Sequence, residues 1–158
     1  KFNISHCGAH TMDTMRMESG FLHWGHDISP EENQYQAGLN FVISYKKPFN
    51  FIGKEKLLKI KDKKQDKRLI MFYLKNSKPG YPLLLHDEPI YLNNKIIGKT
   101  TSGNYSFNYN KNISFGYINS HLSNKELNDL GLFVEIEKQK FQAEILFKPL
   151  KQSNFKKI

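Results

Sequence analysis

The sequence predicts an α+β chain in two parts, a helix-and-loop part over residues 1–65 and a strand-rich part over residues 66–158. Apolar residues near the start recur at the spacing of a helix face, whereas short alternating segments bounded by turn residues begin at Arg68. A lysine-rich stretch over residues 54–68 separates these two patterns. With 39% hydrophobic and 13% aromatic residues, the 158-residue chain has enough apolar side chains for a packed core.

The first predicted helix ends close to Gly20. Ala9, Met12 and Met15 recur on one helix face, and a glycine is a typical C-terminal stop, so Glu18 falls in the last turn. The helix macrodipole is negative at that end, which disfavours a carboxylate by roughly 0.3–1 kcal/mol unless a cation, a donor ligand or water compensates it. The position of Glu18 therefore indicates that one of these partners lies beside it, and a bound ligand is one of them.

The residues after this helix are suited to a binding wall. Trp24 offers a flat apolar ring, and Gly25 permits close backbone approach beside the carboxylate. After a loop over residues 21–36, the sequence predicts a strand over residues 41–45 and a helix that opens after Gly53.

The second part is predicted to hold six short strands joined by turns. Asn93 and Asn94 form a two-residue loop suited to a type I′ hairpin, because asparagine tolerates a positive φ. Ser123 followed by Glu126 predicts a capping box and a short helical turn. This spacing of strands favours a small antiparallel barrel or a sandwich. The predicted strands cover residues 68–74, 89–92, 95–99, 112–117, 132–138 and 141–147.

Cysteine and histidine content excludes a disulfide framework and gives no metal site. Cys7 is the one cysteine of the sequence, and its expected role is that of a small buried hydrophobe rather than a nucleophile. His6 and His10 could share a helix face, but they lack a third ligand. A reducing compartment fits, so we expect the cytoplasm, or the mitochondrial matrix if the source is eukaryotic.

The start of the chain and its apolar runs indicate a soluble protein. No apolar run approaches the roughly 20 residues that span a bilayer, and the opening residues lack the pattern of a signal peptide. The first residue is Lys1 rather than a methionine, which we interpret as a cut within a longer chain.

The formal net charge of +9 raises the possibility of nucleic-acid binding. The excess lies in two lysine-rich runs, over residues 54–68 and 151–157, and the first contains apolar residues typical of a surface helix with a solvated face. Base recognition would favour arginine forks and aromatic stacking platforms, so a nucleic-acid-binding barrel is kept only as an alternative. A basic rim would also suit a polyanionic ligand.

Motifs in the first part resemble a known family. The first runs from Arg16 to Gly20, the next is Trp24-Gly25 with Asp27-Ile28, and the last are residues 36–39 and 51–54. In this order they resemble the second half of the folate-binding domain of the glycine-cleavage T-protein (aminomethyltransferase). The form with Leu22-His23-Trp24-Gly25 is most similar to the folate-dependent part of dimethylglycine and sarcosine dehydrogenases.

The second part resembles the same family. Residues 92–103, then Ser106, then residues 114–118 are similar to the family's C-terminal barrel, in which a hairpin leads into a threonine-serine-glycine turn. The resemblance implies the remnant of a folate-binding domain over residues 1–65 and a C-terminal β-barrel over residues 66–158. It also implies that Thr100, Thr101, Ser102 and Gly103 form the turn by which the barrel contacts the folate domain.

The resemblance also implies site residues. Glu18 matches the family glutamate that binds the pterin ring through paired hydrogen bonds; the alternative is a salt bridge to Arg16 or a lysine. Trp24 either stacks on the pterin or packs in the core, and Arg16 either orients Glu18 or caps the helix end. Lys47 stands where T-proteins hold an arginine that engages folate carboxylates; lysine lacks the bidentate fork, so a solvated role is equally open.

The implied function is one-carbon transfer from an amine donor to tetrahydrofolate, as in glycine cleavage or in dimethylglycine or sarcosine demethylation. The implied partners are folate, which can be polyglutamylated, and the upstream half of the same polypeptide. The family's catalytic aspartate would lie upstream, as would any FAD domain, because no glycine-rich dinucleotide motif is visible. We therefore expect no catalytic residue and no activity in these residues alone. A non-catalytic folate-binding or regulatory module is the main alternative.

Overall fold

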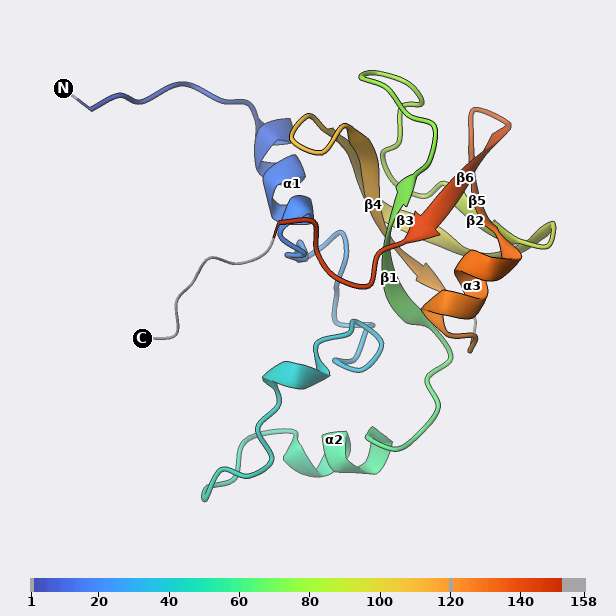
Figure 1. Ribbon diagram of the computed structural model, residues 1–158. Helices are drawn as coiled ribbons and strands as arrows, with labels where there is room; N and C mark the ends of the chain where they lie inside the picture. The colour runs from blue at the N-terminus through green and yellow to red at the C-terminus, as the bar shows by residue number, and fades with distance from the viewer. Residues whose placement is uncertain (1, 120, 152–158) are drawn as a thin grey trace.

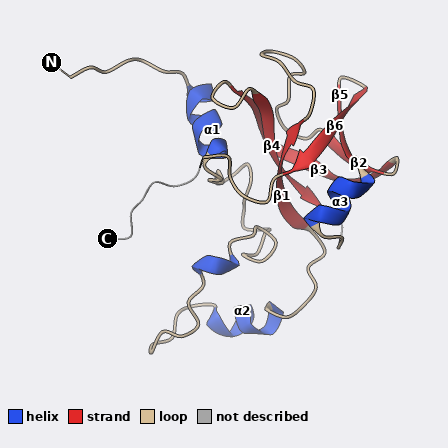
Figure 2. Cartoon of the chain, viewed as in Figure 1, coloured by secondary structure: helices blue, strands red, loops and turns tan. Residues whose placement is uncertain are grey.

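The structure, a computed structural model, describes residues 2–119 and 121–151 (Figure 1). Six antiparallel strands close into a barrel in the order β1-β4-β3-β2-β5-β6, with β6 pairing back onto β1. The barrel contains all six named strands, and residues 2–66 form helices, turns and loops (Figure 2). The strands are β1 (Arg68–Leu74), β2 (Pro89–Leu92), β3 (Lys95–Ser106), β4 (Lys111–Ile118), β5 (Leu132–Ile136) and β6 (Gln139–Ile145).

The barrel interior is the main hydrophobic core. Alternate residues of each strand point inward, as the buried positions Ile70, Phe72 and Leu74 of β1 show. The helix α3 (Asn124–Leu130) adds the buried Leu127 to this core. A barrel rather than a sandwich results, and the full ring of pairing leaves the sheet without a free edge.

Two turns show how far local sequence determined the strand ends. Asn93 and Asn94 have φ values of 49° and 62°, which confirms the predicted type I′ loop between β2 and β3. Glu137 and Lys138 also have positive φ values, of 51° and 64°. They make the turn between β5 and β6, so the strand predicted over residues 132–138 ends at Ile136 instead.

The strand β3 is longer than the sequence predicted. It continues through residues 100–103, where a turn was expected, because a bulge between Thr100 and Ser102 absorbs one extra residue without ending the pairing with β4. A bulge of this kind re-aims side chains, and here Thr101 and Ser102 both reach the first part of the chain. The expected turn was wrong, but the expected contact with the first part is present.

The strand predicted over residues 41–45 is also wrong. A short 3₁₀ helix, η1 (Asn40–Val42), takes its place, and Phe41 is exposed. A strand needs a hydrogen-bonding partner, and the closed barrel offers no edge to receive one.

Helix α1 (Ala9–Glu18) packs against β3 and β4 on the outside of the barrel. Met17 is 1% exposed and forms a second apolar cluster with Ile113 and Phe115. Gly20, with a φ of 76°, ends the helix turn as predicted, and it lies so close to Pro149 that a Cβ there would be 2.6 Å from the proline Cγ.

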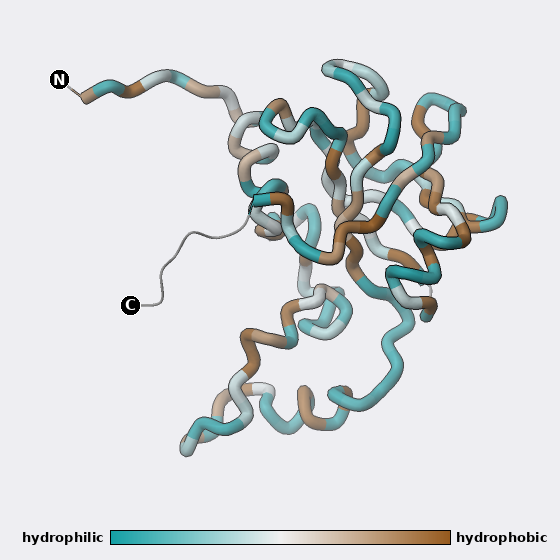
Figure 3. Tube along the Cα trace, in the orientation of Figure 1, coloured by the Kyte–Doolittle hydropathy of each residue, from teal (hydrophilic) through white to brown (hydrophobic). Residues whose placement is uncertain are grey.

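Helix α2 (Lys54–Ile60) begins after Gly53 as predicted, and it lies away from the barrel (Figure 1). None of its residues is buried, and the segment that leads to it carries apolar residues outside the barrel (Figure 3). Among the described residues, no helix is long and apolar enough to cross a membrane.

Hydrogen bonds connect the loop near Gln36 to residues 66–69, where the first part of the chain meets the barrel. Gln36 donates from Nε2 to Asp66 Oδ1 at 2.6 Å, and its carbonyl oxygen accepts the backbone N–H of Leu69 at 2.8 Å. Lys67 Nζ lies 2.6 Å from Glu32 Oε1. The loop before α2 is thus fixed to the start of β1, and a division near residue 65 stays a prediction.

Candidate functional site

Arg16 lies at the junction of three elements. From the last turn of α1 its Nη1 reaches Asp27 Oδ2 in the following loop at 2.7 Å, and its Nη2 donates to Ser102 Oγ on β3 at 2.8 Å. Its Nε donates to Asp13 at 2.9 Å, and Nη1 also reaches the carbonyl of Phe21. The guanidinium orients the loop and the strand, and none of these bonds goes to Glu18.

Asp27 completes this junction from the loop side. Its carboxylate is fully withdrawn from solvent and accepts hydrogen bonds from Thr101 Oγ1 at 2.6 Å and from the backbone N–H of His23 at 2.9 Å. The Asp27 carboxylate thus caps the turn that precedes it and binds Arg16. Arg16 and Asp27 therefore neutralise each other's charge inside the protein.

Glu18 lies on the same helix turn and faces the end of the β3–β4 hairpin. It is 2% exposed, and its Oε1 accepts a hydrogen bond from Ser106 Oγ at 2.6 Å. The side-chain amide of Asn108 spans both carboxylate oxygens, at 3.1 Å and 3.0 Å. Hydrogen-bond donors thus compensate the carboxylate at the negative end of the helix. In the described part of the chain Glu18 makes no ion pair, with Arg16 or with a lysine.

Trp24 and Lys47 lie outside this junction. Trp24 is 65% exposed, so it does not pack in the core of the described chain, and that alternative is wrong. Lys47 is exposed on the loop toward α2, with its Nζ 5.9 Å from the centre of the Phe49 ring. The structure therefore brings Arg16 and Glu18 together on one helix turn and leaves Trp24 and Lys47 open to solvent.

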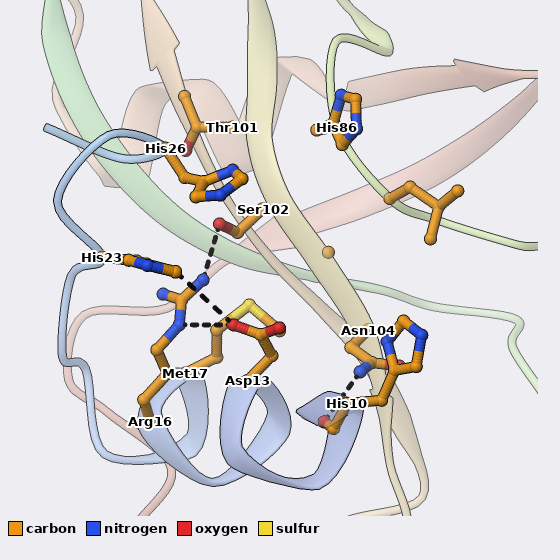
Figure 4. Close-up of a pocket in the computed structure, with 12 residues that line it drawn as sticks. His10, Asp13, Arg16, Met17, His23, His26, His86, Thr101, Ser102 and Asn104 are labelled. Atoms are coloured by element: carbon orange, nitrogen blue, oxygen red, sulfur yellow. Dashed lines mark hydrogen bonds and ion pairs between the residues drawn. The ribbon is translucent and has the colours of Figure 1, made fainter. Parts of the chain in front are cut away.

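A hollow of about 120 Å³ borders the Arg16 junction (Figure 4). His10, His23, His26 and His86 surround it, together with Asp13. The His23 and His26 rings lie 4.6 Å apart. In the described part of the chain, no group of three or more His, Cys, Asp or Glu side chains is arranged to hold a metal ion.

Sequence reasoning missed two partners of the site. Asn108 carried no signal, because it lies in a hairpin turn far along the chain from Glu18. Ser106 appeared only as part of a barrel motif, and its role as a donor to Glu18 depends on how the barrel docks against α1.

Family models match both parts of the chain in order. The model described as the glycine cleavage T-protein C-terminal barrel domain matches residues 67–151, and the GCVT N-terminal domain matches residues 1–47. The chain belongs to the glycine cleavage T-protein family. The predicted resemblance is confirmed, as is the α+β fold with its C-terminal barrel.

Curated members of the T-protein family and its relatives are much longer than this chain. Human mitochondrial dimethylglycine dehydrogenase is 33% identical over 93% of the chain, which spans 16% of that protein. The aminomethyltransferase of Listeria welshimeri is 33% identical over 92% of the chain, which spans 38% of it. The formaldehyde-forming 4-methylaminobutanoate oxidase of Paenarthrobacter nicotinovorans is 43% identical over 62% of the chain, which spans 12% of it.

A solved T-protein structure has the same fold. The crystal structure of aminomethyltransferase T of the glycine cleavage system from Bartonella henselae matches 88% of this chain with a TM-score of 0.73 and 19% sequence identity. The chain covers 37% of that structure. The helix, the loop and the barrel are thus a T-protein fold.

Proposed function

We propose that the chain is the C-terminal portion of a tetrahydrofolate-dependent aminomethyltransferase-like protein, which transfers a one-carbon unit from an amine donor to tetrahydrofolate. The observation that carries this proposal is the order of the two family matches, an N-terminal-domain match over residues 1–47 followed by a barrel match over residues 67–151. Relatives named as an aminomethyltransferase and as a dimethylglycine dehydrogenase support both donor classes, glycine cleavage and demethylation of N-methylated amines.

In this proposal Glu18 binds the pterin ring. Asn108 Nδ2 already contacts both carboxylate oxygens from a single nitrogen, and the paired N–H donors of a pterin would occupy the same two oxygens. The residues fit the group chemically, provided that the turn with Asn108 moves aside, while Ser106 remains as a donor to Oε1. Tetrahydrofolate would supply the acceptor nitrogen for the one-carbon unit, and Glu18 would orient it.

The other predicted residues take supporting roles. Arg16 acts as a positioning residue, because its bonds to Asp27 and Ser102 fix the helix turn that carries Glu18. Trp24, exposed on the loop after α1, offers an aromatic surface for the ligand. Lys47 supplies a point charge for the folate carboxylates, single or polyglutamylated.

The proposed protein partner is a further part of the same polypeptide. Many large apolar residues of the first part are exposed, which is unusual for a complete surface. The chain spans 38% of its aminomethyltransferase relative, and covering by the remainder of such a protein would bury them. Any FAD would belong to that remainder. These exposed residues are Phe2, Ile4, Met12, Met15, Phe21, Trp24, Phe41, Val42, Phe49 and Ile52.

The test is tetrahydrofolate binding by a hybrid protein. The chain replaces the matching 38% of the Listeria welshimeri aminomethyltransferase, and the hybrid is titrated with tetrahydrofolate in a calorimeter. We expect binding by the hybrid and a loss of roughly 1.5–3 kcal/mol of binding free energy in Glu18→Gln, as for a hydrogen bond to a charged group. Glu31→Gln, an identical change at an exposed position, is the control.

Two results would count against the proposal. If the hybrid folds but binds no tetrahydrofolate, these residues do not form a folate site. If the Glu18→Gln hybrid binds tetrahydrofolate as tightly as the unaltered hybrid, Glu18 does not contact the ligand. Adding an amine donor such as dimethylglycine to parallel samples and following formaldehyde and ammonia separates a catalytic protein from a module that only binds folate.

A further inference from the structure

A second cavity lies between the loop over residues 25–32 and the outer surface of β3 and β4. Its volume is about 570 Å³, far more than the roughly 30 Å³ that one water occupies. Glu18 does not line this cavity, which shares only three residues with the hollow beside Arg16: His26, His86 and Thr101, labelled in Figure 4.

Tyr117 lines this cavity and carries an unsatisfied polar atom. The residue is 9% exposed, and its hydroxyl is the one buried side-chain N or O atom in residues 2–119 and 121–151 that has no hydrogen-bond partner. Burying a hydroxyl without a partner is unfavourable, and such groups in folded proteins usually have a water or a ligand as partner. The ring itself is fixed, because β4 pairs on both sides and Lys67 Nζ lies 5.0 Å from its centre.

The charges around the cavity leave a negative surplus. Lys67 is paired with Glu32 at 2.6 Å, and Lys99 with Asp87 at 2.6 Å. Both lysines are therefore engaged by carboxylates of the same cavity. Glu31 also lines the cavity and makes no ion pair with any described residue.

The charge of Asp27, which also lines the cavity, is balanced by Arg16. Burial, and then the negative charges of Glu32 and Asp27, raise the pKa of Tyr117, so its phenol stays protonated and neutral. The oxygen of that phenol can accept a hydrogen bond as well as donate one. The cavity is therefore more favourable to a cation than to an anion, although the chain as a whole has a net charge of +9.

We propose that this cavity binds a small organic ammonium ion. Its N–H groups donate to the Tyr117 hydroxyl and to the Glu31 carboxylate, and its alkyl part lies along the cavity between Gly25 and β3. A divalent metal does not suit the site, because no group of three metal-ligating side chains exists among the described residues. A carboxylate does not suit it, because both lysines are already paired. The proposal is independent of folate binding.

The test is calorimetric titration of the chain with ethylammonium and with 1,4-diaminobutane, and with acetate as the anionic probe. We expect saturable binding of the amines and none of acetate. Tyr117→Phe removes only the hydroxyl and is expected to weaken amine binding about tenfold. Glu31→Gln, at an exposed position, is expected to weaken it by a similar factor. Tyr91→Phe makes the same change as Tyr117→Phe on β2, away from the cavity, and is the matched control.

Thermal unfolding checks that each variant is folded. Tyr117→Phe leaves the fold intact because the lost hydroxyl has no partner within the described chain. Failure of both amines to bind the unaltered chain overturns the proposal. Amine binding that is unchanged in both Tyr117→Phe and Glu31→Gln also overturns it, and identifies Tyr117 as a hydroxyl that binds water only.

Discussion

Arg16 and Asp27 form an ion pair of 2.7 Å in which the carboxylate has no exposed surface and the arginine side chain keeps 13% of its own. Each partner also bonds to β3, Arg16 to Ser102 and Asp27 to Thr101. The pair therefore holds helix α1, the loop after it and the barrel in one arrangement.

Asp27→Asn is expected to destabilise the chain by about 3 kcal/mol, because it leaves the charge of Arg16 with only Asp13 as a partner in a partly buried site. The measurement is urea unfolding followed by circular dichroism. Asp129→Asn, the same change at an exposed residue, is the control and should stay within about 0.5 kcal/mol of the unaltered chain. Equal stability of the two variants would show that the junction is dispensable.

Asn108→Ala is expected to have opposite effects on stability and on folate binding. It removes an amide that hydrogen-bonds to the Glu18 carboxylate, which should cost about 1.5–3 kcal/mol of unfolding free energy. In the Listeria hybrid it should strengthen tetrahydrofolate binding, because it removes the competing donor. Weaker folate binding in this variant would mean that Asn108 supports the ligand and does not compete with it.

Stability is expected to fall in acid partly through Glu32. Burial alone would raise the pKa of Glu32, but hydrogen bonds from Lys67 and Ser29 outweigh it and hold the pKa below its ordinary value of 4.5. A carboxyl whose pKa is lowered in the folded state contributes stability above the unfolded pKa and loses it as the pH falls through the folded pKa.

Glu32→Gln should therefore reduce the difference in urea midpoint between pH 7 and pH 3. Midpoints measured at both values for this variant, for the unaltered chain and for Glu31→Gln test the idea. The pH dependence of Glu31→Gln should resemble that of the unaltered chain, since Glu31 has no ion pair among the described residues. An undiminished pH dependence in Glu32→Gln would contradict the role of the Glu32–Lys67 pair.

Hydrogen exchange should distinguish the two helices of the first part. Amides of β1 and β4 are expected to be strongly protected, and those at the end of α1 intermediate, because Met17 and Glu18 are buried against the barrel. Amides of α2 should exchange fastest, because none of its residues is buried. Protection of α2 equal to that of α1, measured by mass spectrometry, would show that α2 is covered in solution by another surface, such as a second copy of the chain.

Local sequence determined the elements whose signals lie within a few residues. The strand predicted over residues 68–74 has the bounds of β1, and Asn93 with Asn94 made the expected hairpin because their backbone tolerates positive φ. Ser123 and Glu126 form the predicted capping box of α3. The unusual place of Glu18 at a helix end was also visible in the sequence, as was its need for hydrogen-bond donors.

Only the tertiary structure decided which groups meet those needs. The partners of Arg16 and Glu18 on the barrel, Ser102 and Ser106, lie 86 and 88 residues further along the chain. No spacing rule reaches that far, since the contact depends on a bulge in β3 and on how α1 docks across the barrel. Closure of the barrel likewise decided against a strand at Phe41, because every strand edge already had a partner.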